Sequence, residues 1–331
     1  MDFSLSLDIK PIDQPITYKG SVLLIGSCFT EHISDRLAQH RLPVCSNPHG
    51  ILFNPLSVAD SLERYVSGHC YTENDLFLLH ELWHSWEHHS RFSDIDKNAA
   101  LQKMNGALAE AHEVVKNATH VIITLGSSFQ YYLKESNQPV ANNHRAPGQW
   151  FEKRLLETDL IYERLKRSME RIIAINTGVQ FIFTISPVRH IRDGVVANNR
   201  SKARLLEAVH RICDAYENAY YFPAYELVID ILRDYRFYDI DFVHPNYMAT
   251  QYVWEQFVAA CIDEPSRQIM SRVAAITTAL KHRPRFPNTQ AHTQFLKEQA
   301  ERTKQLLQEY PYLDLEDALR YFNQVGSSIK E

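Results

Sequence analysis

The sequence has no long apolar run, no excess of positive charge and no nucleotide-binding glycine motif. Its apolar runs are only a few residues long, whereas a membrane-spanning helix needs about 20. The formal net charge of −5 gives no reason to expect nucleic acid or an anionic membrane as a partner. Neither GxxxxGK[ST] nor GxGxxG occurs, so nucleotide binding has no support. With 45% hydrophobic and 23% charged residues, the composition is that of a soluble, packed protein.

Paired cysteines are also lacking. The five cysteines are odd in number, widely scattered and free of CxxC spacing: Cys28, Cys45, Cys70, Cys213 and Cys261. This pattern argues against a disulfide framework and against a zinc ribbon. The first residues, MDFSLSLDIKPIDQP, carry acids and prolines where a signal peptide needs a basic start and an apolar core. We therefore expect a reducing, cytoplasmic location.

Short apolar runs alternate with amphipathic stretches along most of the chain. Buried strands are predicted at 22–25, 120–124 and 179–185, with another at 220–222, and helices at 30–40, 56–66, 98–117, 155–176, 201–218 and 225–232. Residues 71–94 read as short strands and a loop, and 133–150 as a long loop, which tends to be functional. This alternation predicts a parallel sheet covered by helices on both faces.

After about residue 263 the strand pattern stops and helical stretches follow, separated by a break at 283–287. We expect a helical appendage packed on the α/β core, or an arm through which two copies of the chain associate.

The stretch SVLLIGSCFT at 21–30 contains the first chemical signal. A buried strand that stops at Gly26-Ser27 before a helix places the serine at the carboxyl end of a parallel sheet, where α/β proteins bind their ligands. The turn also directs backbone N–H groups and the positive end of the helix dipole toward that point. Ser27 is therefore a candidate nucleophile, although a serine that only caps the helix would give the same pattern.

The second signal is Asp241-Phe-Val-His244, followed by Pro245. An acid and a histidine three residues apart can face the same side of a turn. The carboxylate then fixes the imidazole tautomer and leaves the other ring nitrogen free to take a proton from serine. Asp-x-x-His also arises by chance in surface turns, so the signal gains weight only together with Ser27.

Several blocks of the sequence resemble one known family. They are GSCFT at 26–30, NPHGILFNP at 47–55, SWEHHSRFS at 85–93, ITLG at 123–126, VANNH at 140–144, SPVRHIRDG at 186–194, NNRSKARL at 198–205 and DFVHPN at 241–246. The chain thereby resembles the GSCFA family, a branch of the SGNH/GDSL hydrolases. The resemblance implies a three-layer α/β/α flavodoxin-like domain over residues 1–262 and a helical C-terminal extension over 263–331.

The resemblance also implies a chemistry. Ser27 would be the nucleophile, His244 the general base and Asp241 its orienter, in an esterase that needs no cofactor. The substrate would be a small-molecule or glycan ester, for example an O-acetyl group on a carbohydrate. With the same triad, acyl transfer to a second alcohol is a further alternative.

For the oxyanion hole the resemblance implies the backbone N–H groups of Ser27 and Gly50. SGNH enzymes add an asparagine from a Gly-x-Asn-Asp block, but this chain has Gly126-Ser127-Ser128-Phe129 there. Ser128, or Asn142 or Asn143 from the following loop, could substitute. The missing asparagine also supports a different class of function, a catalytically weak binding protein with the same pocket.

The histidine-rich stretch around residues 80–89 suggests another kind of site. Helical spacing would align three of its histidines as metal ligands, but Trp83, Ser85 and Trp86 interrupt any clean helix, so no metal site is predicted. We expect instead that His89 and Ser90 line the substrate pocket.

Four other polar residues remain, the first three with two interpretations each. Ser186 and Arg189 follow a predicted strand and either contact substrate or form a plain strand-end turn. Cys28 is interpreted as a small buried residue rather than a thiol nucleophile, and Lys202 as a solvated charge. We expect no nucleic acid and no membrane partner, and association of two copies would use the C-terminal helices.

Overall fold

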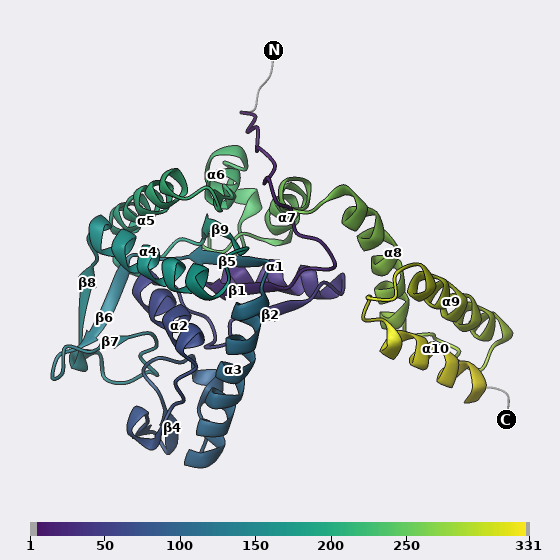
Figure 1. Ribbon diagram of the computed structural model, residues 1–331, viewed down its shortest axis with the longest axis horizontal. Coiled ribbons are helices and arrows are strands. Elements are labelled where there is room, and N and C mark those ends of the chain that lie inside the picture. Colours follow the sequence, from purple (N-terminus) through teal and green to yellow (C-terminus); the bar gives the residue numbers. More distant parts are fainter. Residues whose placement is uncertain (1–4, 329–331) are drawn as a thin grey trace.

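A five-stranded parallel sheet forms the centre of the computed structural model, which describes residues 5–328 (Figure 1). Its strands lie in the order β10-β9-β5-β1-β2. In chain order the strands are β1 (Val22–Gly26), β2 (Val44–Ser46), β5 (His120–Leu125), β9 (Gln180–Ile185) and β10 (Ala219–Tyr221). Read from the other edge, the spatial order is 2-1-3-4-5 in the sequence of these five strands, which is the flavodoxin-like arrangement. The prediction of a flavodoxin-like parallel sheet is confirmed.

The sheet is covered on both faces because alternate residues of each strand point to opposite sides. The helices around the sheet are α1 (Cys28–Gln39), α2 (Pro55–Ser67), α3 (Lys97–Asn117), α4 (Thr158–Ile175), α5 (Val195–Ala215), α6 (Ala224–Glu226) and α7 (Tyr247–Cys261). On β1, Val22 and Leu24 belong to the cluster formed with α1 and α7, whereas Leu23 and Ile25 belong to the cluster formed with α2 to α5. The three-layer prediction is therefore confirmed.

Local signals set the ends of these helices. Asn54 accepts a hydrogen bond from the backbone N–H of Ser57, and Pro55 occupies the first helical position of α2. The same helix ends at Gly68, whose φ of 63° is the left-handed value that glycine adopts without strain. Among the described residues, no helix is long and apolar enough to cross a membrane.

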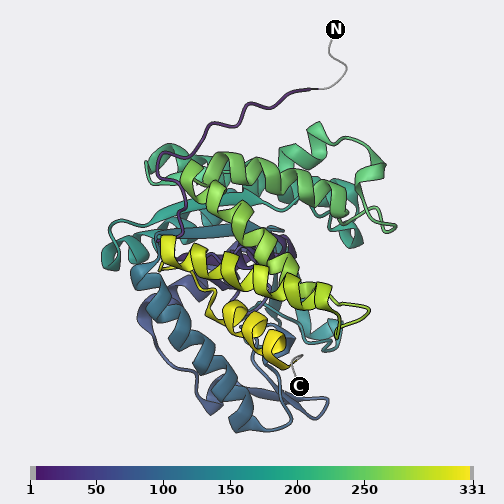
Figure 2. The same cartoon turned by 90° about the vertical axis from the view of Figure 1, so that its right-hand side faces the viewer.

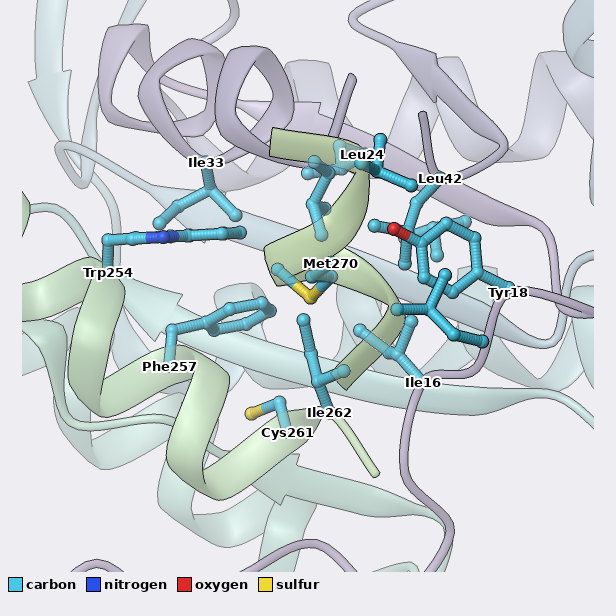
Figure 3. Close-up of a cluster of buried hydrophobic side chains, with 14 of the residues drawn as sticks. Ile16, Tyr18, Leu24, Ile33, Leu42, Trp254, Phe257, Cys261, Ile262 and Met270 are labelled. Atoms are coloured by element: carbon cyan, nitrogen blue, oxygen red, sulfur yellow. The ribbon is translucent and has the colours of Figure 1, made fainter. Parts of the chain in front are cut away.

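Three further helices extend the layer formed by α1 and α7. They are α8 (Glu264–Lys281), α9 (Gln290–Glu309) and α10 (Glu316–Ser328), and they form the helical group seen on the right of Figure 1 and in front in Figure 2. Figure 3 shows that Met270 of α8 joins the apolar cluster of Ile33 and Trp254. The predicted helical C-terminal region is confirmed. Through Met270, α8 packs in the same apolar cluster as Ile33 of α1.

Two small antiparallel sheets flank the core. The pair β3 (Phe77–Leu79) and β4 (Leu82–His84) was expected as short strands within 71–94. The second sheet was missed and consists of β6 (Phe129–Leu133), β7 (Pro139–Val140) and β8 (Phe151–Leu155). Of the predicted loop at 133–150, only Leu133 at the end of β6 and the two-residue strand β7 belong to this sheet. The sheet was missed because Pro139 and the neighbouring asparagines look like a turn, while β6 and β8 pair through backbone bonds that composition does not reveal.

Candidate active site

Ser27 lies between the end of β1 and the start of α1, at the carboxyl edge of the sheet. It occupies the N-cap position of α1, yet its side chain makes no capping hydrogen bond. The hydroxyl is buried, with Ser27 only 2% exposed, and Oγ has no hydrogen-bond partner among the described residues. A buried hydroxyl without a partner costs about 1–3 kcal/mol. The structure therefore does not use this hydroxyl to stabilise the helix, although serine at this position normally does so.

Gly26 sets the approach of Ser27 to the neighbouring strand. Its φ is +146°, and a Cβ atom there would lie 2.1 Å from the carbonyl oxygen of Thr124. The backbone N–H of Gly26 donates to Asn47 Oδ1 at 2.9 Å, and its carbonyl accepts from Leu52 N at 2.9 Å. Only glycine fits such a contact, so the turn before Ser27 is rigid and close to β5.

The turn that carries His244 is organised by Asp241. One carboxylate oxygen accepts from the backbone N–H of Val243 at 2.9 Å and of His244 at 3.0 Å, while the other lies 2.6 Å from His244 Nδ1. The hydrogen bond with His244 is the main reason why the pKa of Asp241 falls to about 2. Asp241 is therefore ionised at neutral pH, and it holds the imidazole with Nε2 directed away from the carboxylate.

His244 faces a groove of about 630 Å³ between α1 and the start of α7. The groove is lined mainly by polar side chains and by three aromatic rings, from Phe29, His32, Ile33, Asp35, Arg36, Gln39, Asp239, His244, Pro245, Asn246, Tyr247, Thr250 and Trp254. Phe29 lies two residues after Ser27, so the groove begins beside the serine turn. The structure contains no hydrogen bond between Ser27 and His244.

Three of the four expected oxyanion donors, all but the amide N–H groups of Asn142, already make another hydrogen bond. The backbone N–H of Ser27 donates to Thr124 O at 3.1 Å, and that of Gly50 donates to Asn47 O at 2.7 Å. The hydroxyl of Ser128 is buried and donates to Ser201 O at 3.0 Å. Asn142 Oδ1 accepts from the backbone N–H of His144 at 2.9 Å. These hydrogen bonds hold the surrounding turns in place, and the sequence did not indicate them.

None of the four expected substrate contacts lines the groove beside His244. Ser186 is fully buried, and its hydroxyl accepts from Val188 N at 3.3 Å. Arg189 contacts the turn of His244, since its backbone N–H donates to Val243 O at 3.3 Å. Its guanidinium group also lies 4.3 Å from the ring centre of Tyr238. Arg189 thus supports the Asp-x-x-His turn from behind.

His89 and Ser90 lie on the side of the loop around Gly50. The Cβ atom of His89 would be 2.2 Å from a Cβ atom on Gly50, whose φ is +82°. The backbone N–H of His89 donates to His49 O at 2.9 Å, and Ser90 is exposed. Gly50 is thus required for this close contact of two loops.

Lys202 was wrongly interpreted as a solvated charge. It is 1% exposed, and its Nζ donates to Gly126 O at 2.6 Å and to Ser186 O at 2.5 Å. Burial lowers the pKa of Lys202 to about 7, and its charge interacts with the thiol of Cys28. This lysine joins the carboxyl ends of β5 and β9 next to Ser27. Its position in an amphipathic helical stretch did not reveal this burial.

Cys28 and the histidine-rich stretch are the other two places that the sequence suggested for chemistry. Cys28 is partly exposed, and burial raises the pKa of its thiol, with a further contribution from Glu31. His84 is bound through its ring to Ser93 Oγ at 2.6 Å and to Leu79 O at 3.1 Å. His88 stacks on His49 instead. Within residues 5–328, no group of three or more potential ligands is arranged to hold a metal ion.

Two family models match the sequence. The model of the GSCFA family covers residues 21–257, which include every residue of the site described above. The model described as GSCFA domain protein, C-terminal domain, covers residues 273–325, within the helices α8 to α10. A comparison with curated proteins finds no match.

Proposed function

The chain belongs to the GSCFA family, and from this premise we propose that it is a serine hydrolase that cleaves an ester bond. The observation that supports the proposal most strongly is the free hydroxyl of Ser27. It stands at the N-cap of α1 without capping the helix, at the sheet edge where α/β enzymes act. His244, which is hydrogen-bonded to Asp241, lines the groove that begins beside this serine.

In the proposed reaction, Ser27 Oγ bonds to the acyl carbon while His244 Nε2 takes the hydroxyl proton. His244 then gives that proton to the leaving alcohol oxygen as its bond to the acyl carbon breaks. Water, activated by the same nitrogen, releases the acid and restores Ser27. Asp241 stays ionised throughout and stabilises the imidazolium form of His244. The proposal requires the exposed turn at 239–246 and Ser27 to approach in the substrate complex, where such hydrogen bonds commonly tighten.

The groove beside His244 fits the alcohol part of the ester. Asp35 and Gln39 offer hydrogen-bonding groups, and the exposed ring of Tyr247 offers a flat apolar face. This combination suits a hydroxyl-rich group such as a sugar. We therefore propose a small acyl group, such as acetyl, on a carbohydrate hydroxyl. If a second alcohol entered the groove in place of water, the same triad would transfer the acyl group.

The competing function is a binding protein with weak catalysis. It is supported by the engaged N–H groups of Ser27 and Gly50 and by the 2% exposure of Ser27. For the cellular location we propose the reducing cytoplasm, because all five cysteines are free thiols.

A fluorophosphonate probe separates the two functions. We expect the wild-type protein to be labelled, Ser27→Ala to be unlabelled, and Ser271→Ala, a substitution on the exposed face of α8, to be labelled at the wild-type rate. For hydrolysis of p-nitrophenyl acetate we likewise expect activity in the wild type and in Ser271→Ala and none in Ser27→Ala. An unlabelled wild type would favour the binding protein. Labelling of Ser27→Ala at the wild-type rate would place the nucleophile elsewhere.

A further inference from the structure

His190 approaches Ser27 across the face of Gly126. A Cβ atom built on Gly126 would lie 3.4 Å from His190 Nε2 and 3.4 Å from Ser27 Cβ. The two atoms are therefore at most 6.8 Å apart, which is twice that distance. Gly126 places no side chain between the imidazole and the serine, and Phe53 Cβ borders the same position at 3.1 Å.

Both the backbone and the ring of His190 are held in place. The backbone N–H donates to the side chain of Asn198, at the start of α5, at 2.9 Å. The imidazole ring packs at 68° against the ring of Phe53, with the ring centres 6.0 Å apart. Neither ring nitrogen has a hydrogen-bond partner among the described residues, and neither is fully buried. The ring is thus anchored while its nitrogens stay available to a bound molecule.

The surroundings of His190 favour its neutral form. Burial is the largest cause that lowers its pKa to about 4, and Lys202 and Lys153 lower it further. Asp193 acts in the opposite direction, and His244 adds to the lowering. A neutral imidazole is a weak base at neutral pH, but it retains one N–H donor. Such a group can stabilise a developing negative charge without taking up a proton.

We propose that His190 donates a hydrogen bond from Nε2–H to the oxyanion formed when Ser27 attacks the acyl carbon. It would fill the place of the asparagine that is absent at Ser128, whose own hydroxyl is engaged with Ser201. This inference rests on the proposed ester hydrolysis, and it makes His190 a catalytic residue in addition to the triad. In the ground state the carbonyl oxygen is nearly uncharged, so the bond strengthens in the transition state.

The test compares His190→Phe with His190→Gln, using p-nitrophenyl acetate and the rate of fluorophosphonate labelling. Phenylalanine keeps a ring against Phe53 but has no donor, whereas the glutamine amide places an N–H near the position of Nε2. We expect His190→Phe to lower kcat by roughly 10²–10³-fold with little change in KM. His190→Gln should recover at least about 10-fold of that loss, because it restores the donor. His69→Phe, an exposed histidine after α2, serves as the control and should match the wild type.

The outcomes separate the inference from the proposed function. If the wild type is labelled and Ser27→Ala is not, but His190→Phe keeps its kcat, the donor role of His190 is wrong while the hydrolase stands. A loss in His190→Phe that glutamine does not restore, at an unchanged unfolding temperature for both variants, also overturns the donor role. If the wild type itself is unreactive, the proposed function fails and the inference fails with it.

Discussion

Replacing Lys202 by methionine should change how the stability of the protein depends on pH. Methionine has a similar length but carries neither charge nor N–H donors. In the wild type, burial lowers the pKa of Lys202 from 10.5 to about 7. A neutral amine still has two N–H groups, which is enough to serve both Gly126 O and Ser186 O. The folded protein can therefore release this proton without losing either hydrogen bond.

The direction of the change in unfolding free energy with pH follows from which state, folded or unfolded, keeps the proton on Lys202. Between pH 7 and 10.5 the unfolded chain keeps the proton on Lys202 and the folded protein does not, so raising the pH favours the folded state. Below pH 7 both states are protonated and this contribution is constant. The full lowering of the Lys202 pKa, from 10.5 to about 7, corresponds to about 5 kcal/mol of unfolding free energy, at about 1.4 kcal/mol for each pKa unit. Between pH 7.5 and 9.5 the wild type should gain about 2.5 kcal/mol from this group alone.

The assay is urea unfolding followed by tryptophan fluorescence at several pH values in that interval. Taking the difference between wild type and Lys202→Met removes the titration of other groups. That difference should grow in favour of the wild type by about 2.5 kcal/mol. Lys304→Met, at an exposed site on α9, should show a difference that does not change with pH. A constant difference for Lys202→Met would mean that the two carbonyls keep the amine charged in the folded protein, which refutes the reasoning.

Two further predictions concern the serine turn and the acid of the proposed triad. Gly26→Ala should lower the free energy of unfolding by at least about 2 kcal/mol, because its Cβ would meet Thr124 O at 2.1 Å. Gly106→Ala is the matched control: it lies within α3 with nothing near its Cβ position and should gain up to about 1 kcal/mol, so equal effects in urea unfolding would contradict this explanation. Asp241→Asn should lower kcat on p-nitrophenyl acetate by roughly 10³–10⁴-fold, because asparagine does not favour the reactive tautomer. The pKa of Asp241 near 2 means that acid between pH 4 and 7 does not protonate it, and a variant within about 10-fold of wild type would exclude Asp241 from the triad.

The central sheet could be predicted because its strands are continuous apolar runs. The runs at 22–25, 120–124 and 179–185 are buried on both faces, and each appears in the structure within one residue or so of the expected ends. Burial on both faces leaves a strong compositional signal. The partly exposed strands β6 and β8 have mixed composition, and they were missed.

The local parts of the candidate site are also visible in the sequence. Gly26-Ser27 after a buried strand defines a turn at the sheet edge, and Asp241 reaches His244 because only two residues separate them. Both depend on interactions within a few residues of the chain. That Ser27 and His244 act together in one site stays a prediction.

Tertiary structure alone decided the surroundings of the serine. Lys202 is buried because the ends of β5 and β9 present two carbonyl oxygens to it, from segments 76 and 16 residues away. His190 comes near Ser27 because both lie against Gly126, which follows β5 and places no side chain between them. These positions depend on strand order and register, which bring distant segments together and leave no periodic pattern in the chain. The sequence by itself thus indicates the candidate reactive groups, whereas the fold determines which neighbours surround them and set their protonation.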